Sequence, residues 1–168
     1  MAQDRLTPPN SRLADPNLQV QQRQGRPNVI ILTSGITGSS VLTGFLAQSG
    51  YWAGDTTHKK EYNTFENSEL IRLNLQIFEQ AGYTGNYTSE FSSDAIARIA
   101  CLHGRIDDSS YVEFLRKCSE HRPWVWKDPR LWLTMYFWKH LLNTQECRFI
   151  LLTRNLVQAW VGHPFSSL

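Results

Sequence analysis

The sequence predicts an α/β domain in which a parallel sheet carries helices on both faces. Three short apolar runs, at 28–33, 124–126 and 148–153, are rich in β-branched or aromatic residues and predict buried strands. The segments between them carry apolar residues at helical spacing. Because buried strands that alternate with helices form parallel sheets covered on both sides, we expect three layers.

Length and composition are those of one folded domain. The chain has 168 residues, of which 41% are hydrophobic and 19% charged, so it is long enough to bury a core. Residues 1–27 are polar and contain several prolines, and they predict a mobile tail before a domain at 28–168. The 20 aromatic residues fit a core, a substrate pocket or a partner surface equally well.

Charge and cysteine content exclude several classes of protein. The net charge of +2 is too small to indicate a nucleic-acid partner. The first residues lack the apolar core of a signal peptide, and no apolar run is long enough for a transmembrane segment, so a cytoplasmic protein is expected. Three cysteines without metal-like spacing predict free thiols, and no metal site is expected.

The first strand and the first helix are the best defined elements. Strand 28–33 ends at a loop of small and hydroxylated residues, and a helix is expected over 39–48. Its apolar residues suggest one buried face, and Gly50 suits the left-handed residue that ends a helix. That apolar face comprises Val41, Leu42, Phe45 and Leu46.

The remaining elements follow from apolar spacing, capping residues and Pro129, which stops the middle strand. The segment 51–67 is polar and aromatic, and we expect an irregular loop that lines a cleft or lies on the surface. Helices are expected over 65–80, from Ser92 or Ser93 to about 103, from 107–109 onward, over 131–142 and from 156 to 161, with a loop at 82–89.

The loop after the first strand has the chemistry of an anion site. Strand, tight Gly/Ser loop and helix bring backbone N–H groups, hydroxyls and the positive end of a helix dipole together, which suits a phosphate or sulfate group. An ordinary turn with capping serines is the alternative. The loop lacks the Gly-Lys-Ser/Thr of a Walker A motif, which argues against an ATP or GTP hydrolase.

Two cationic side chains follow the other two strands. Lys127 lies at the end of the middle strand and Arg154 at the end of the third. Ligands of such sheets bind beyond the carboxyl ends of the strands, so both cations and the Gly/Ser loop are expected to border one crevice. Each cation has an alternative as part of a salt bridge, for example Lys127 with Asp128, and Arg130 is an equal candidate for the contact.

Three motifs in order resemble the sulfotransferases that use 3′-phosphoadenosine-5′-phosphosulfate (PAPS). ITGSS (36–40) is similar to the 5′-phosphosulfate loop, WVWKDPR (124–130) to the middle strand of bacterial members, and FILLTRN (149–155) to the strand that ends at the 3′-phosphate. The resemblance implies a P-loop-like fold and sulfuryl transfer from PAPS without a metal. The acceptor would be a hydroxyl or amine of a small molecule, lipid or carbohydrate.

The resemblance also assigns roles to individual residues. Arg154 would bind the 3′-phosphate, since its planar fork makes two charge-assisted bonds, and Lys127 would stabilise the leaving group. A general base must lie near the acceptor hydroxyl, and His58, Glu61, Glu66 and Asp128 are the candidates. Glu66 has an alternative as a first-turn acid of the helix expected at 65–80. The residues that would cradle the 5′-phosphosulfate are Thr37, Gly38, Ser39 and Ser40.

Three departures from the family pattern support an alternative hypothesis for the function. Ile36 stands where the family carries a loop Lys or Arg, Gly162 stands where it carries a serine, and the chain ends at Leu168 before the family fold is complete. The alternative is therefore a catalytically impaired sulfotransferase-fold remnant that binds an anion, a nucleotide or a protein partner. An incomplete sheet would favour a homodimer. A small-molecule kinase is a third, weaker reading.

Overall fold

A three-stranded parallel sheet forms the centre of the domain. The computed structural model describes residues 25–34, 37–59, 63–85 and 91–153. Strand β1 (Asn28–Thr33) lies between β4 (Val125–Lys127) and β5 (Cys147–Leu152), and both neighbours run parallel to it. The predicted α/β class and the three predicted strands are confirmed, and β1 and β4 are buried as expected, but β5 is mostly exposed or half-buried.

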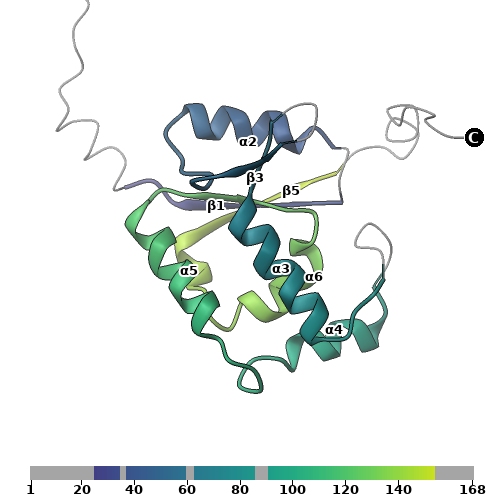
Figure 1. The fold of residues 1–168 in the computed structure, drawn as a ribbon. Coiled ribbons are helices and arrows are strands. Elements are labelled where there is room, and N and C mark those ends of the chain that lie inside the picture. The colour runs from purple at the N-terminus through teal and green to yellow at the C-terminus, as the bar shows by residue number, and fades with distance from the viewer. Residues whose placement is uncertain (1–24, 35–36, 60–62, 86–90, 154–168) are drawn as a thin grey trace, which may run out of the picture.

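Helices cover both faces of the sheet, as Figure 1 shows. On one face, α2 (Ser39–Gln48) packs against Val29 and Ile31 of β1. On the other face, Ile30 belongs to the larger core. That core is built with α3 (Ser68–Gln80), α5 (Ser109–Glu120) and α6 (Leu131–Trp138), and α4 (Ser93–Ala100) packs against α6. The alternation of side chains along β1 thus separates two apolar layers.

Aromatic rings fill the centre of the larger core. The Trp126 ring stacks on Trp124 at 4.7 Å between centroids, and it meets Trp138 edge-on at 5.0 Å. Phe114 of α5 stacks on Trp126 at 5.4 Å, and Tyr111 packs edge-on against Trp138 at 5.5 Å. Much of the aromatic content therefore belongs to the core, one of the three readings that composition left open.

The segment 51–67 contains a hairpin, and the expectation of an irregular loop there was wrong. Strand β2 (Thr57–Lys59) pairs antiparallel with β3 (Asn63–Asn67). Helix α3 consequently begins at Ser68, and not at Phe65. Its N-cap is Asn67, whose side-chain oxygen accepts hydrogen bonds from the backbone of Glu69 (3.0 Å) and Leu70 (3.4 Å). An asparagine at this position ends the strand and starts the helix.

Two helices end earlier than expected. Helix α4 begins after Ser92, which caps it, and ends at Ala100, and α6 ends at Trp138. Beyond Trp138 the chain makes tighter bonds, such as His140 N–H to the carbonyl of Phe137 at 3.1 Å, and then a 3-10 turn, η1 (Thr144–Glu146). Apolar residues continue past each helix end, which explains why their spacing extended the predictions. The helix expected from 156 lies outside the described residues.

The apolar face predicted for α2 was half wrong. Leu42 and Leu46 pack on the sheet as expected, but Val41 is 79% exposed and Phe45 is 66% exposed. The small residues Thr43 and Gly44 are buried instead. The Phe65 ring of the hairpin lies against Gly44, so that position of α2 leaves no room for a larger side chain.

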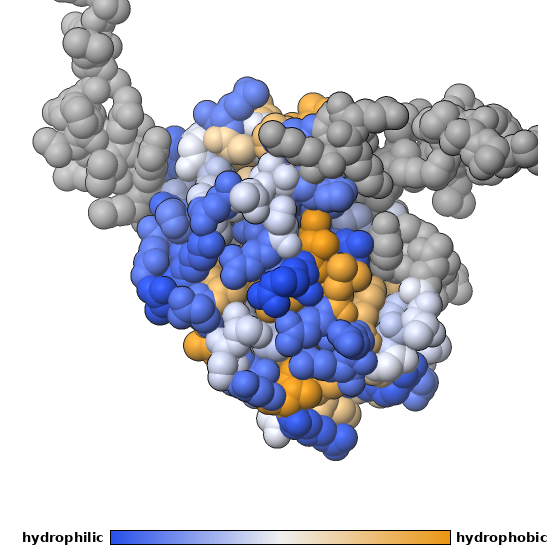
Figure 2. All heavy atoms as spheres, in the orientation of Figure 1, coloured by the Kyte–Doolittle hydropathy of each residue, from blue (hydrophilic) through white to orange (hydrophobic). Residues whose placement is uncertain are grey.

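Strand β5 leaves part of one sheet face uncovered. Phe149 and Leu151 pair in register with Ile30 and Leu32 of β1, yet they are 46% and 59% exposed. The helices on this face cover β1 and β4 more fully than β5. In Figure 2 the viewed face is mainly hydrophilic, with apolar residues in small separate areas. No helix in the described ranges is long and apolar enough to cross a bilayer.

The three thiols differ in accessibility, which gives a first prediction. Cys101 is exposed, whereas Cys118 and Cys147 are buried, and all three are free. Burial raises the pKa of Cys118 to about 12 and that of Cys147 to about 11, so both stay protonated near neutrality. We expect a thiol-specific reagent to modify Cys101 quickly in the folded protein and the other two only in denaturant. Mass spectrometry of labelled peptides checks this, and fast native labelling of Cys118 would contradict it.

The same burial predicts a loss of stability at alkaline pH. Cys118 ionises near its ordinary value of 9.0 in the unfolded chain but only near 12 when folded. Its contribution is therefore intact below pH 9 and is lost as the pH rises toward 12, with a slope of about 1.4 kcal/mol per pH unit. Urea unfolding across this range measures the slope. The Cys118→Ala variant should show a shallower one, and an unchanged slope would contradict the assignment.

Candidate anion-binding site

The candidate site lies where two neighbouring strands end and their helices diverge. Strand β1 continues into α2 on one face of the sheet, whereas the adjacent strand β4 continues into α6 on the other face. Helices that leave in opposite directions open a crevice at the carboxyl ends of the strands. The Gly/Ser loop and Lys127 both border this position, as expected from the sequence.

The described part of the loop folds tightly onto the start of α2. The hydroxyl oxygens of Thr33 and Thr37 lie 2.5 Å apart in a hydrogen bond, which draws the end of β1 toward the helix. Gly38 is the N-cap with φ of +85°, a left-handed conformation that favours glycine. Residues 35–36 lie outside the described residues, and the Ile36 position with them.

Helix α2 begins without a capping side chain. Its N-cap, Gly38, makes no side-chain capping hydrogen bond, and the turn Ser39–Leu42 contains no acidic residue. The hydroxyl of Thr43 bonds back to the carbonyl of Ser39 at 2.7 Å and so stays inside the helix. The positive end of α2 therefore remains available to an anion.

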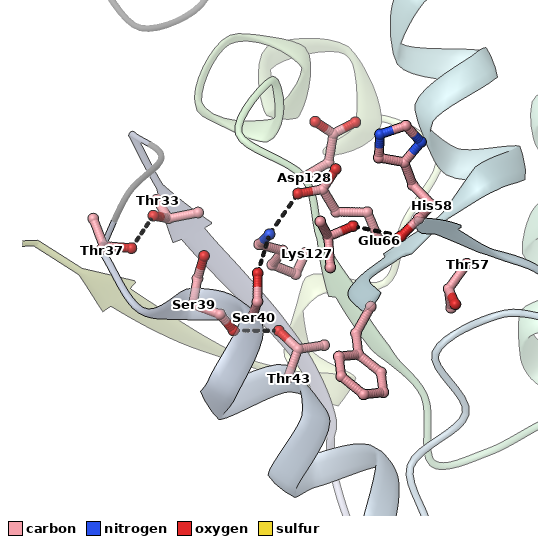
Figure 3. A network of polar contacts seen from close by, with 12 residues as sticks. Thr33, Thr37, Ser39, Ser40, Thr43, Thr57, His58, Glu66, Lys127 and Asp128 are labelled. Atoms are coloured by element: carbon pink, nitrogen blue, oxygen red, sulfur yellow. Dashed lines mark hydrogen bonds and ion pairs between the residues drawn. The ribbon is translucent and has the colours of Figure 1, made fainter. Parts of the chain in front are cut away.

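Lys127 is a buried cation directed at this helix start. Its side chain is 4% exposed, and its Nζ donates to the Ser40 hydroxyl at 3.3 Å. The same Nζ forms an ion pair with Glu66 Oε1 at 2.5 Å, and the Glu66 side chain is 12% exposed. Figure 3 shows Lys127 between Ser40 of α2 and the carboxyl groups of Glu66 and Asp128.

Glu66 reaches Lys127 because the hairpin places it there. The residue lies on β3, and not in the first turn of a helix as one reading of the sequence held. The hairpin is fixed by the Thr64 hydroxyl, which donates to the carbonyl of His58 at 2.8 Å. His58 itself lies on β2, half-buried, beside the strand that carries Glu66. Its role as a base stays a prediction.

Asp128 is fully buried, and its carboxylate accepts three hydrogen bonds. Oδ1 accepts from the backbone N–H and the Nη1 of Arg130, at 3.0 and 2.9 Å. Oδ2 accepts from Asn74 Nδ2 at 2.8 Å, and Asn74 Oδ1 in turn accepts from Trp138 Nε1 at 2.8 Å. These contacts hold the turn behind Lys127. They favour a supporting role for Asp128, and its predicted catalytic role remains untested.

Asn74 and Trp138 are the parts of the site that sequence reasoning missed. Asn74 lies on α3 and is fully buried, and it links Asp128 to α6 through two side-chain hydrogen bonds. A single buried asparagine in an amphipathic helix could have signalled such a role. Nothing local in the sequence identifies Trp138 as its partner, because that contact spans 64 residues.

Other predicted residues lie elsewhere or outside the described ranges. Arg154, assigned to the 3′-phosphate, lies outside them, as do the candidate base Glu61 and the neighbouring Tyr62 of the segment 51–67. Trp52 stacks on the His121 ring at 4.7 Å beside the start of β4, at the opposite end of the sheet from Lys127. Phe65 lies beside α2 next to Glu66.

The charges of the site are balanced in the structure described. The buried Lys127 is paired with the carboxylate of Glu66, so an oxyanion bound at Ser40 would share Lys127 with Glu66. In the part of the chain that the structure describes, no group of three or more His, Cys, Asp or Glu is placed to hold a metal ion.

The chain was also compared with known proteins. No family model, no curated protein and no solved structure matches it.

Proposed function

We propose that this protein transfers a sulfuryl group from PAPS to a hydroxyl or amine acceptor. The observation that carries the proposal is Lys127, a buried cation whose Nζ contacts both the first turn of α2 and the carboxylate of Glu66. An anion cradle, a cation and a candidate base in contact are the groups that such a transfer requires. The ordered motifs of the sequence point to the same chemistry.

The residues present suit the 5′ end of the nucleotide. The N–H groups and hydroxyls at Thr37, Gly38, Ser39 and Ser40 surround the uncapped helix start, where an oxyanion is stabilised by dipole and hydrogen bonds. Lys127 would add a full positive charge from the neighbouring strand. Arg154 is proposed for the 3′-phosphate on the sequence motif alone.

PAPS, when bound, supplies the sulfuryl group and a phosphate leaving group. Lys127 holds its ammonium beside Ser40, where negative charge must be neutralised as the bond to the leaving group weakens. Glu66 is preferred as the base among the candidates in the described residues, since its carboxylate lies in the site beside Lys127, and it would accept the acceptor proton. Asp128 has its donors already in place and would keep the turn rigid.

Nucleotide binding is the first test of the proposal. We expect 3′-phosphoadenosine-5′-phosphate to bind with micromolar affinity in calorimetric titration, about −8 kcal/mol, because the cradle and two cations would each contact a phosphate. The Arg154→Ala variant should lose most of this affinity. A folded wild-type protein that takes up no nucleotide at millimolar concentration would contradict the proposal. Release of this nucleotide from PAPS with a pool of acceptors then tests turnover.

The non-catalytic alternative has one structural argument. Glu66 already neutralises Lys127, and Ile36 replaces the loop cation of the family pattern, so the site has less positive charge than transfer favours. The Ile36→Arg variant separates the two readings. If the protein is an impaired remnant, the variant should gain turnover that the wild type lacks, whereas a wild type that already turns over well would contradict this alternative.

A further inference from the structure

Phe65 has the least favourable backbone conformation among the described residues of the hairpin. Its φ is +54°, in the left-handed region, and it is the one non-glycine residue with positive φ in the described ranges. A bulky L side chain adopts this conformation only at an energetic cost, so the surrounding structure must hold it there. Such residues gather at functional sites, and Phe65 immediately precedes Glu66.

The backbone on either side of Phe65 is fixed by asparagines. Asn63 Oδ1 accepts from the Phe65 N–H at 2.9 Å and from the Thr57 hydroxyl at 2.9 Å. Asn67 pairs with Thr57 across the hairpin and caps α3. With both ends of this five-residue strand held, the turn at Phe65 sets the direction in which Glu66 leaves the strand.

The Phe65 ring is held against helix α2 at Gly44. A Cβ built at Gly44 would lie 2.8 Å from Cε2 of the ring and 3.2 Å from Cδ2, which is too close for a larger residue without movement. Gly44 lies one turn after Ser40, and these positions share one side of the helix. The ring therefore contacts α2 beside the hydroxyl that receives the hydrogen bond from Lys127.

We propose that Phe65 is the positioning residue of the site: its ring on Gly44 braces the left-handed turn that directs the Glu66 carboxylate onto Lys127. The contact joins the hairpin to α2, so the candidate base and the anion cradle keep one relative placement. The effect of Phe65 on catalysis rests on the proposed function. Its effect on the Glu66–Lys127 ion pair does not, so these two effects can be tested separately.

The direct test measures how well Glu66 shields Lys127 from acetic anhydride, with the exposed Lys139 of the same chain as internal reference. We expect Phe65→Ala to remove the brace and Gly44→Ala to displace the ring, each making Lys127 acetylation about tenfold faster relative to Lys139. Phe65→Tyr keeps the ring and should react as the wild type does. Labelled peptides are quantified by mass spectrometry.

A matched control separates positioning from a general loss of stability. Gly82→Ala adds the same methyl group as Gly44→Ala but just past the C-terminal end of α3, at a residue whose φ of +60° is left-handed like that of Phe65. It should lower the melting temperature without changing Lys127 labelling. If Lys127 in folded Phe65→Ala is as protected as in the wild type, the inference is overturned, whatever the activity of the protein.

Kinetics then test the catalytic consequence. If the wild type transfers sulfuryl groups, Phe65→Ala should lower kcat by about 10²-fold, because a small displacement of a reacting group has that effect. The KM for PAPS should change by less than about threefold, since the cradle on α2 is intact. If Phe65→Ala labels faster at Lys127 but keeps its kcat, the role of Phe65 in catalysis is overturned and its role in placing Glu66 stands. If the wild type shows no turnover, the proposed function is contradicted, and the labelling experiment alone decides whether Phe65 places Glu66.

Discussion

Replacing Lys127 with methionine is expected to lower kcat for PAPS-dependent transfer by about 10²–10³-fold, the effect of removing one charge-stabilising donor from a preorganised site. The reason is its position, because the Lys127 side chain is 4% exposed and its Nζ contacts both Ser40 and Glu66. Steady-state rates of nucleotide release from PAPS measure the effect. Lys127→Arg keeps the charge and should retain more activity than Lys127→Met.

The Lys127→Met variant also leaves the carboxylate of Glu66, which is only 12% exposed, without its partner. Breaking a buried pair from one side costs about 3–5 kcal/mol, so Lys127→Met alone could lose activity by unfolding. The double variant Lys127→Met/Glu66→Gln removes both charges and should recover much of the stability but none of the turnover. Urea unfolding and rates on the same preparations separate the two effects. Full turnover by a stable double variant would contradict the roles proposed for both residues.

Replacing Asp128 with alanine is expected to lower the free energy of unfolding by about 3–5 kcal/mol. The carboxylate is fully buried and accepts three hydrogen bonds, from Asn74 and Arg130. Its removal leaves the Arg130 charge, with a side chain only 16% exposed, without this counterion. Because domains are stable by about 5–15 kcal/mol, this one substitution would remove a large part of the total. Chemical denaturation monitored by tryptophan fluorescence measures it.

An exposed aspartate supplies the control for this experiment. Asp94 pairs with Arg98 at 3.0 Å on the surface of α4, and its side chain is 76% exposed. Asp94→Ala should change the free energy of unfolding by less than about 1 kcal/mol, as exposed ion pairs do. A cost of that small size for Asp128→Ala would show that the buried network is dispensable.

The sequence predicted the parts of the fold that local patterns encode. The three strands and the start of α2 were placed to within one residue, because short apolar runs and the Gly/Ser loop are strong local signals, although β5 is less buried than expected. The hairpin was missed, since its strands are short and polar and are held by pairing between them. The burial of Gly44 in place of Phe45 follows from the approach of β3 to α2, which spacing within one helix cannot reveal.

The candidate site was predicted in its location more than in its contacts. The rule that ligands bind at the carboxyl ends of parallel strands led to Lys127 and the loop beside it. The contact of Glu66 with Lys127 depends on the hairpin, and the hydrogen bonds of Asp128 depend on α3 and α6, so neither follows from local spacing. These contacts join residues far apart in the chain, and local sequence patterns do not indicate which distant side chains will meet.

The placement of β1 has a consequence for how the chain is made. On one side of β1, Val29 pairs with Val125 of β4. On the other side, Asn28 pairs with Cys147 of β5, roughly 120 residues later in the chain. At a synthesis rate of about 5–20 residues per second, the nascent strand waits roughly 6–24 seconds on the ribosome before its second neighbour exists. Until then the apolar segment 29–32 is exposed and its backbone is unpaired, so it can associate with other chains. Ribosome-associated chaperones are therefore expected to shield it during translation.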